Sequence, residues 1–283
     1  MLKKTVLLCT FFWMCVAHAE NVVLMIGDGM GKNHVSCASK DMGLFLNETP
    51  VRSAITTHSA NNAVTDSAAS ATVYACGIKT NNGFLGVDTH QKSCQTIAET
   101  ALEHGMFVGI LSTDMMTGAT PSAFYAHVTD RYMADTIKTH LQKARSAGMD
   151  IRLAVPTLSD EVDRLLTKAE QSGQPFFLMI EGARIDTRSH ENKFDLMAFE
   201  LRDFDQAVKT VVDRLKTHPD TTVIVTADHE TGGLNDHCVF TTRHHTSSNV
   251  NVWAFGGQAD LLNTVRDNTD IYRMIHHILI GKQ

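Results

Sequence analysis

Short apolar runs that alternate with longer helical patterns constrain this chain more than any other feature of its sequence. The continuous apolar runs are typical of strands buried on both faces, and their alternation with helices is typical of a parallel sheet. We therefore predict an α/β fold with a mostly parallel central sheet and helices on both faces. The expected strands are 21–26, 107–111, 151–155, 176–180, 222–226 and 250–255, and the expected helices include 97–104, 131–146, 159–171 and 194–216.

The chain offers no internal boundary between domains. Its 283 residues are 43% hydrophobic, which is enough to build a substantial core and excludes a disordered class. It has only 5 prolines and no Pro-rich or Ser-rich linker. We predict a single domain over residues 20–283.

The first 19 residues have the pattern of a secretory signal peptide. Lys3 and Lys4 precede an apolar run over residues 5–16, and the sequence Ala-His-Ala ends the segment before Glu20. The run is too short to span a membrane, and no later stretch reaches the necessary length of about 20 apolar residues. We expect cleavage before Glu20, no membrane span, and a periplasmic or secreted location.

The charge and the cysteine content restrict the possible binding partners of the protein and its cellular compartment. The formal net charge is −6, and loss of Lys3 and Lys4 would bring it to −8, which argues against a nucleic-acid partner. Outside the predicted signal peptide, the sequence permits disulfides in an exported protein but leaves three pairings open, and it has no Cys-x-x-Cys spacing for a thiolate zinc site. The cysteines concerned are Cys37, Cys76, Cys94 and Cys238.

Carboxylate and imidazole side chains gather after the predicted strands, where open α/β sheets place their ligands. Taken singly, each is explained by a helix cap or a surface ion pair. Their recurrence after three strands, with a histidine ahead of a fourth, favours a metal centre. The residues are Asp28, Glu181, Asp186, His190, Asp228, His229 and His245.

Two further residues suit the chemistry of a phosphoryl group. Ser67 opens the run Ala-Ala-Ser-Ala-Thr, a good helix start, and the N-terminus of a helix stabilises an anion. No general-base motif lies beside it, so a metal would have to lower its pKa. Arg131 is expected to begin a helix and could clamp two phosphate oxygens. The ordinary alternatives are that Asp66 or Ser67 only caps a helix and that Arg131 is a solvated helix residue.

Taken together, these segments resemble the alkaline phosphatases, and they occur in the order found in that family. The resemblance implies an alkaline-phosphatase-like three-layer sandwich and covers most of the chain. It rests on residues 22–31 (VVLMIGDGMG), 64–72 (VTDSAASAT), 81–88 (NNGFLGVD), 119–121 (ATP), 126–129 (AHVT) with Arg131, 180–182 (IEG) with Asp186 and His190, 225–229 (VTADH) and 245–246 (HT).

The resemblance also implies two zinc ions (Zn²⁺) and one magnesium ion (Mg²⁺). Asp186, His190 and His245 would hold the first zinc. Asp28, Asp228 and His229 would hold the second zinc, which also contacts Ser67. Asp28, Thr120 and Glu181 would hold the magnesium. These ligand types suit the ions, because zinc accepts imidazole and carboxylate and magnesium prefers oxygen.

The implied activity is hydrolysis of a broad range of small phosphate monoesters, with release of inorganic phosphate through a phosphoserine on Ser67. Arg131 would bind the nonbridging phosphoryl oxygens. A phosphodiesterase of the same superfamily is an alternative, whereas a sulfatase is disfavoured because no Pro or Arg context follows Ser67. A catalytically impaired metal-binding or phosphate-binding protein is the alternative from another class.

Three positions and the length of the chain depart from the family pattern. Gly118 replaces a side chain that helps to order the third metal site, so we expect magnesium to bind weakly. Thr187 and Thr231 bring no positive charge, so we expect weak binding of product phosphate. The insertions that form the crown and support dimers are expected to be reduced or absent, which leaves a homodimer open.

Overall fold

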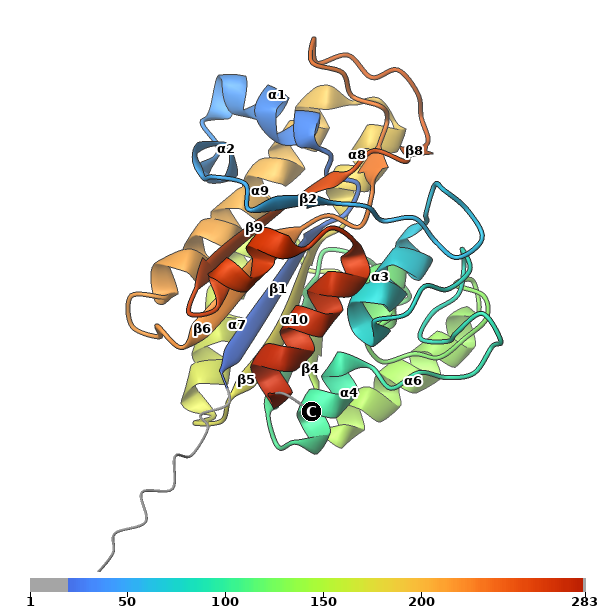
Figure 1. Ribbon diagram of the computed structural model, residues 1–283, viewed down its shortest axis with the longest axis vertical. Helices are drawn as coiled ribbons and strands as arrows, with labels where there is room; N and C mark the ends of the chain where they lie inside the picture. Colours follow the sequence, from blue (N-terminus) through green and yellow to red (C-terminus); the bar gives the residue numbers. More distant parts are fainter. Residues whose placement is uncertain (1–19, 282–283) are drawn as a thin grey trace, which may run out of the picture.

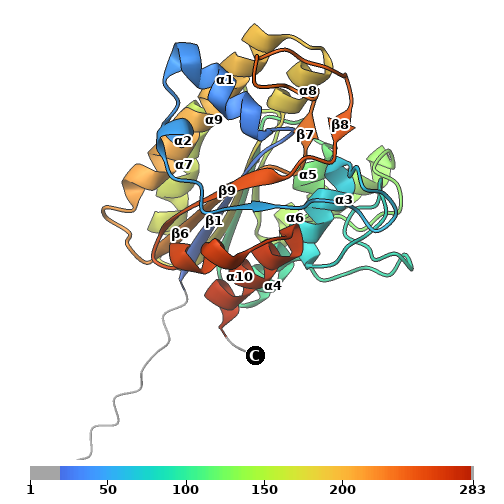
Figure 2. The same cartoon turned by 45° about the horizontal axis from the view of Figure 1, so that its top comes forward.

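A seven-stranded sheet forms the centre of the computed structural model, which describes residues 20–281 (Figures 1 and 2). Its strand order is β2-β9-β6-β1-β5-β3-β4. The strands β6, β1, β5, β3 and β4 run parallel, while β9 is antiparallel to both β6 and β2. The mostly parallel α/β fold predicted from the sequence is therefore confirmed. The predicted signal peptide lies outside the described residues.

The strands follow the apolar runs closely. All seven residues of both β1 and β5 are buried, as expected for strands covered on both faces. The sheet strands are β1 (Asn21–Gly27), β2 (Ser53–Ile55), β3 (Phe107–Ser112), β4 (Asp150–Arg152), β5 (Phe176–Gly182), β6 (Thr221–Thr226) and β9 (Val250–Gly256). A separate two-stranded sheet pairs β7 (Glu230–Thr231) with β8 (His245–Thr246).

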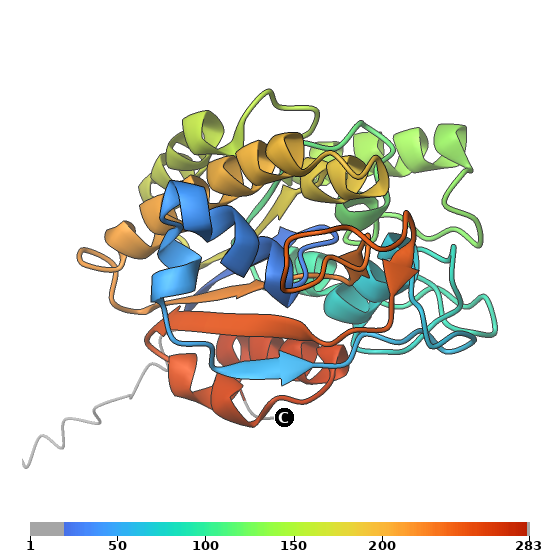
Figure 3. The same cartoon turned by 90° about the horizontal axis from the view of Figure 1, so that it is seen from above.

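Helices cover both faces of the central sheet. Helices α7 and α9 contact one face, and α4 and α10 contact the other, so that the view from above shows three layers (Figure 3). The helices are α1 (Lys32–Met42), α2 (Phe45–Glu48), α3 (Ser67–Cys76), α4 (Ile97–Glu103), α5 (Ala119–Ser122), α6 (Ala134–Ala147), α7 (Leu158–Gln171), α8 (Arg184–His190), α9 (Phe194–Arg214), the 3₁₀ helix η1 (Ala259–Thr264) and α10 (Asn268–Ile280).

Two sequence predictions need correction. Arg131 does not begin a helix: it lies in a turn, and α6 begins three residues later at Ala134. The backbone of Arg131 instead donates to the Gly83 carbonyl at 2.8 Å, which ties this turn to the 81–88 loop. The strand expected over 151–155 is the short β4 over Asp150–Arg152, because Ala154 adopts a positive φ of 57° that ends the extended backbone.

The topology places the predicted site residues at one end of the sheet. The parallel strands β1, β5, β3 and β6 all end there, and Figure 2 shows α3, α5, α8 and the β7–β8 pair gathered around those ends.

Two disulfides, Cys37–Cys238 and Cys76–Cys94, select one of the three open pairings. Over residues 20–281, no helix is both long and apolar enough to cross a membrane.

Candidate metal centre

Three histidines present the same ring nitrogen to one site. The Nδ1 atom of His190 lies 2.6 Å from the Arg243 carbonyl, and that of His245 lies 2.9 Å from the Thr65 carbonyl. Because a carbonyl only accepts, each Nδ1 carries the hydrogen and each Nε2 keeps a free lone pair. The Nε2 atoms of His190 and His245 are 3.0 Å apart. This orientation by outer partners is typical of metal-binding histidines.

His229 is oriented in the same way by a hydroxyl group. Thr231 Oγ1 donates to Asp186 Oδ1 at 2.5 Å and lies 3.2 Å from His229 Nδ1. Since the hydroxyl hydrogen is already given to the carboxylate, the oxygen accepts the Nδ1 hydrogen, and His229 Nε2 keeps its lone pair. The sequence analysis noted Thr231 only as a residue that brings no positive charge. Its buried hydroxyl in fact holds one residue from each predicted zinc set.

The first predicted zinc set forms a compact group. His190 Nε2 and His245 Nε2 lie 3.3 Å and 3.6 Å from Asp186 Oδ1. Helix α8 places Asp186 and His190 one turn apart, while β8 supplies His245 from the other side. One carboxylate and two imidazoles match the ligands of a catalytic zinc, which keeps a further position for water or substrate.

The second predicted zinc set also converges. His229 Nε2 lies 3.1 Å from Asp228 Oδ2 and 3.7 Å from Asp28 Oδ1. Asp228 Oδ1 accepts the amides of Gly29 and His229, which turns Oδ2 toward the site. Asp186 is also close enough to Asp28 and His229 to share a cation with them, so the two sets are contiguous.

The third predicted site collects buried oxygens without partners. Within residues 20–281, Asp28 Oδ1, Thr120 Oγ1 and Glu181 Oε1 are buried and have no hydrogen-bond partner. Thr120 and Glu181 are fully buried. An unpaired buried polar atom is costly, so such a set indicates a ligand that satisfies it. Three oxygens fit a hard cation such as magnesium.

The electrostatics of the centre favour bound cations. Burial raises the pKa of Asp28 well above its ordinary value, and the charges of Asp228 and Asp186 raise it further. Burial also raises the pKa of Glu181, and the charge of Asp114 adds to the effect. Carboxylates forced together in this way are stabilised by a multivalent cation more than by protons near neutral pH.

Ser67 lies beside the second zinc set. It is the first residue of α3, is only 4% exposed, and places its Oγ 3.2 Å from His229 Nε2. The helix cap is Asp66, whose side chain accepts the Ala69 amide at 2.9 Å. The sequence left open whether Asp66 or Ser67 caps the helix. Because Asp66 does so, the Ser67 hydroxyl is available to the site.

Arg131 reaches the same region through Asp66. Its Nη1 donates to Asp66 Oδ2 at 3.1 Å, and the same oxygen accepts the Gly83 amide. Burial opposes the charge of Arg131, but Asp66 outweighs this effect and raises the pKa of the guanidinium. The ion pair therefore holds the positive charge of Arg131 next to Asp66, the residue that precedes Ser67.

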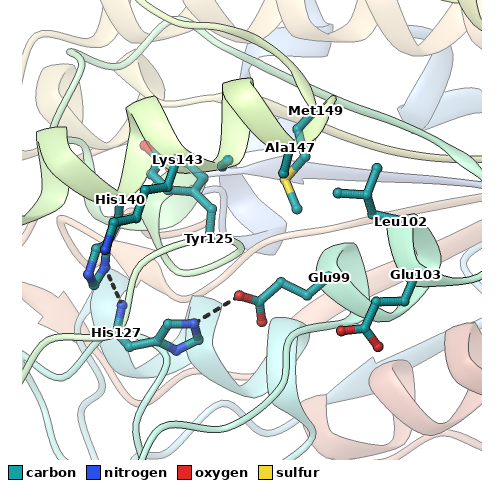
Figure 4. Close-up of a pocket in the computed structure, with 10 residues that line it drawn as sticks. Glu99, Leu102, Glu103, Tyr125, His127, His140, Lys143, Ala147 and Met149 are labelled. Carbon is teal, nitrogen blue, oxygen red and sulfur yellow. Dashed lines mark hydrogen bonds and ion pairs between the residues drawn. The ribbon is translucent and has the colours of Figure 1, made fainter.

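A separate cavity of about 430 Å³ lies between α4 and α6, outside the metal centre (Figure 4). His127, from one of the family-like motifs, borders it and pairs with Glu99 at 3.0 Å. The His127 Nδ1 atom also faces the Gly86 carbonyl at 2.7 Å. Both ring nitrogens are engaged by acceptors, so His127 is a structural residue that links the 81–88 loop to α4.

Comparison with known proteins agrees with this geometry. The family model described as Alkaline phosphatase matches residues 19–152 and 136–239. The chain is 27% identical to the repressible alkaline phosphatase of Saccharomyces cerevisiae, over 76% of this chain and 55% of that one. It is 28% identical to alkaline phosphatase 4 of Bacillus subtilis, over 77% and 63%. The chain thus matches between half and two-thirds of the length of these relatives.

A solved structure has the same fold as this chain. The alkaline phosphatase from the Antarctic bacterium TAB5 superposes with a TM-score of 0.86 at 25% identity, covering 94% of this chain and 99% of that one. A TAB5 variant described with Mg bound in its M3 site superposes with a TM-score of 0.87. Since the family model spans most of the chain and the fold agrees, this protein belongs to the alkaline phosphatase family.

Proposed function

We propose that this protein hydrolyses small phosphate monoesters, with Ser67 as the nucleophile and a phosphoserine as the intermediate. The observation that carries the proposal is the position of Ser67 Oγ. It lies at the start of a buried helix and 3.2 Å from Nε2 of His229, a residue of the second predicted zinc set. The start of a helix also favours the negative charge of a phosphoryl group.

The proposed cations are two zinc ions and one magnesium ion. Asp186, His190 and His245 would hold the first zinc, and Asp28, Asp228 and His229 the second. Asp28, Thr120 and Glu181 would hold magnesium. Bound there, the ions would lower the pKa of the serine hydroxyl and of water and stabilise the leaving oxygen. The orphaned oxygens and the Nε2 atoms that the three histidines present to the site support this assignment, as does the magnesium described for the TAB5 variant.

The chain's own residues would carry out two displacements. In the first, a bond forms between Ser67 Oγ and phosphorus while the ester P–O bond breaks and the alcohol leaves. In the second, water attacks the phosphoserine, the Oγ–P bond breaks, and inorganic phosphate is released. The guanidinium of Arg131 and the amide of Ser67 would bind the nonbridging oxygens throughout. Recognition would centre on the phosphoryl group, so the range of monoesters should be broad.

Export is part of the proposal. Two disulfides are typical of proteins in oxidising compartments, which supports a periplasmic or secreted location.

The test is release of p-nitrophenol from p-nitrophenyl phosphate at mildly alkaline pH. We expect turnover by the zinc- and magnesium-loaded protein, loss of at least a thousandfold in Ser67→Ala, and loss and recovery on chelation and reloading. Ser36→Ala is the matched control, because Ser36 lies on α1 and, within residues 20–281, its hydroxyl bonds only to its own helix turn. Equal turnover by wild type and Ser67→Ala would overturn the serine mechanism.

Two further measurements separate the alternatives. Faster release from bis(p-nitrophenyl) phosphate than from the monoester would identify a phosphodiesterase. Metal content and phosphate binding without turnover would identify a catalytically impaired binding protein. The monoester proposal expects neither result, since Arg131 suits the two charges of a monoester phosphoryl group.

A further inference from the structure

The space beside Gly118 is filled by another residue of the same loop. A Cβ atom placed on Gly118 would lie 2.0 Å from Asp114 Oδ2 and 2.3 Å from Asp114 Cγ. Position 118 therefore cannot carry a side chain while Asp114 keeps its place. Although Gly118 itself has no side chain, the Asp114 carboxylate occupies the space beside it.

Asp114 is connected to the third cation site through Ser112. Its amide donates to Ser112 Oγ at 2.8 Å, and that hydroxyl donates to Glu181 Oε2. Asp114 Oδ1 accepts the Met115 amide at 2.7 Å, which directs Oδ2 toward Gly118, the residue before α5. The first residues of α5 include Thr120.

The charge of Asp114 also acts on this site. Of the charged neighbours of Glu181, Asp114 raises the pKa of that carboxyl most. The charge of Asp114 also raises the pKa of Asp28. Asp114 itself is half-buried. A magnesium ion held by few protein oxygens keeps several water ligands, and these need acceptors in fixed positions.

We propose that Asp114 is a positioning residue of the third cation site and binds through its carboxylate to water on a magnesium ion held by Asp28, Thr120 and Glu181. This inference rests on the proposed function only in assuming that the site takes a cation. Asp114, four residues before Gly118 in the chain, would supply the anionic group that Gly118 cannot provide.

The test measures magnesium binding rather than turnover. Mg²⁺ is titrated by calorimetry into the zinc-loaded wild type, Asp114→Asn and Asp114→Ala. We expect both variants to bind magnesium 10- to 100-fold more weakly, on the order found for outer-shell partners of metal ligands, with unchanged zinc content. Asp114→Asn keeps an acceptor for the Met115 amide, so it separates the effect of removing the charge from the effect of disturbing the loop conformation. Asp88→Asn is the control, because Asp88 also accepts backbone amides in a loop.

A double variant gives a result that a purely structural role would not produce. Gly118→Asp alone should weaken magnesium binding and lower the melting temperature, because the new Cβ overlaps Asp114. In Asp114→Ala the space is free, so adding Gly118→Asp should restore most of the magnesium affinity. Wild-type affinity in Asp114→Asn, or no rescue by the double variant, would overturn the proposal. Absence of magnesium binding by the wild type would overturn it too, whether or not the protein hydrolyses esters.

Discussion

Thr231 shows how one side chain joins the two halves of the metal centre. It contacts Asp186 of the first set and His229 of the second through a single hydroxyl. Replacing it by valine keeps the shape but removes the acceptor that fixes His229 Nδ1. We expect Thr231→Val to bind zinc 10- to 100-fold more weakly, measured by competition with a chelator. Thr231→Ser, which keeps the hydroxyl, should stay close to wild type. Equal zinc affinity in the valine variant would contradict this role.

That the candidate site residues would lie close together could be predicted from the sequence, but the atoms that orient their side chains could not. The sequence placed Asp28, Glu181 and Asp228 after strands, and the parallel topology brings those strand ends together. The partners of His190 and His245 are backbone carbonyls at Arg243 and Thr65, which have no signature in side-chain type. Asp114 was missed for a similar reason, because its role depends on its carboxylate occupying the space beside Gly118, which the sequence does not reveal.

At the scale of elements, prediction succeeded where hydrophobic periodicity is long. Helices α4, α7 and α9 fall within a few residues of the expected ranges, since each buries a regular apolar stripe. Strands β7 and β8 have two residues each, which is too short for any periodic signal, although β8 carries His245. Small elements of this kind are recognised only after the loops that hold them have been placed.

The pair of His127 with Glu99 joins α4 to a neighbouring loop and should make stability depend on pH (Figure 4). The hydrogen bond to Glu99 raises the pKa of His127 above 6.5, and burial opposes it. Burial would raise the pKa of Glu99, but the hydrogen bond and charge of His127, together with the hydrogen bonds from Thr96, outweigh burial and lower that pKa below 4.5. The histidine contribution is therefore complete below pH 6.5 and is lost as pH rises through its raised pKa. The glutamate contribution is present above pH 4.5 and is lost as pH falls.

Glu99→Gln isolates this charge effect, because glutamine can still accept the Thr96 amide that Glu99 accepts in the capping box. At the same metal loading, we expect the variant to be less stable than wild type by about 1 kcal/mol near pH 5.5. The difference should close near pH 10, where His127 is neutral in both states. Urea unfolding at the two pH values measures it. A difference of equal size at both would show that the charge is irrelevant.

At the scale of the whole molecule, the disulfides constrain very different lengths of chain. Cys37–Cys238 closes a separation of 201 residues and ties α1 to the segment before β8, whereas Cys76–Cys94 closes 18 residues. A cross-link stabilises chiefly by restricting the unfolded chain, and the restriction grows with loop length. The long link also holds the segment whose Arg243 carbonyl orients His190. The same bond thus bears on both the stability of the fold and the geometry of the first zinc set.

Removing each disulfide by a pair of alanine substitutions should therefore have unequal effects. The chain-entropy relation gives a loss of about 5 kcal/mol for Cys37→Ala with Cys238→Ala and about 3 kcal/mol for Cys76→Ala with Cys94→Ala. Urea unfolding of the two double variants, each with its metals bound, measures the free energies directly. The first variant should also release zinc to a chelator faster, because loss of the Cys37–Cys238 bond loosens the segment whose Arg243 carbonyl orients His190. A larger loss of stability in the second variant would show that native packing, rather than the unfolded chain, determines what each disulfide contributes.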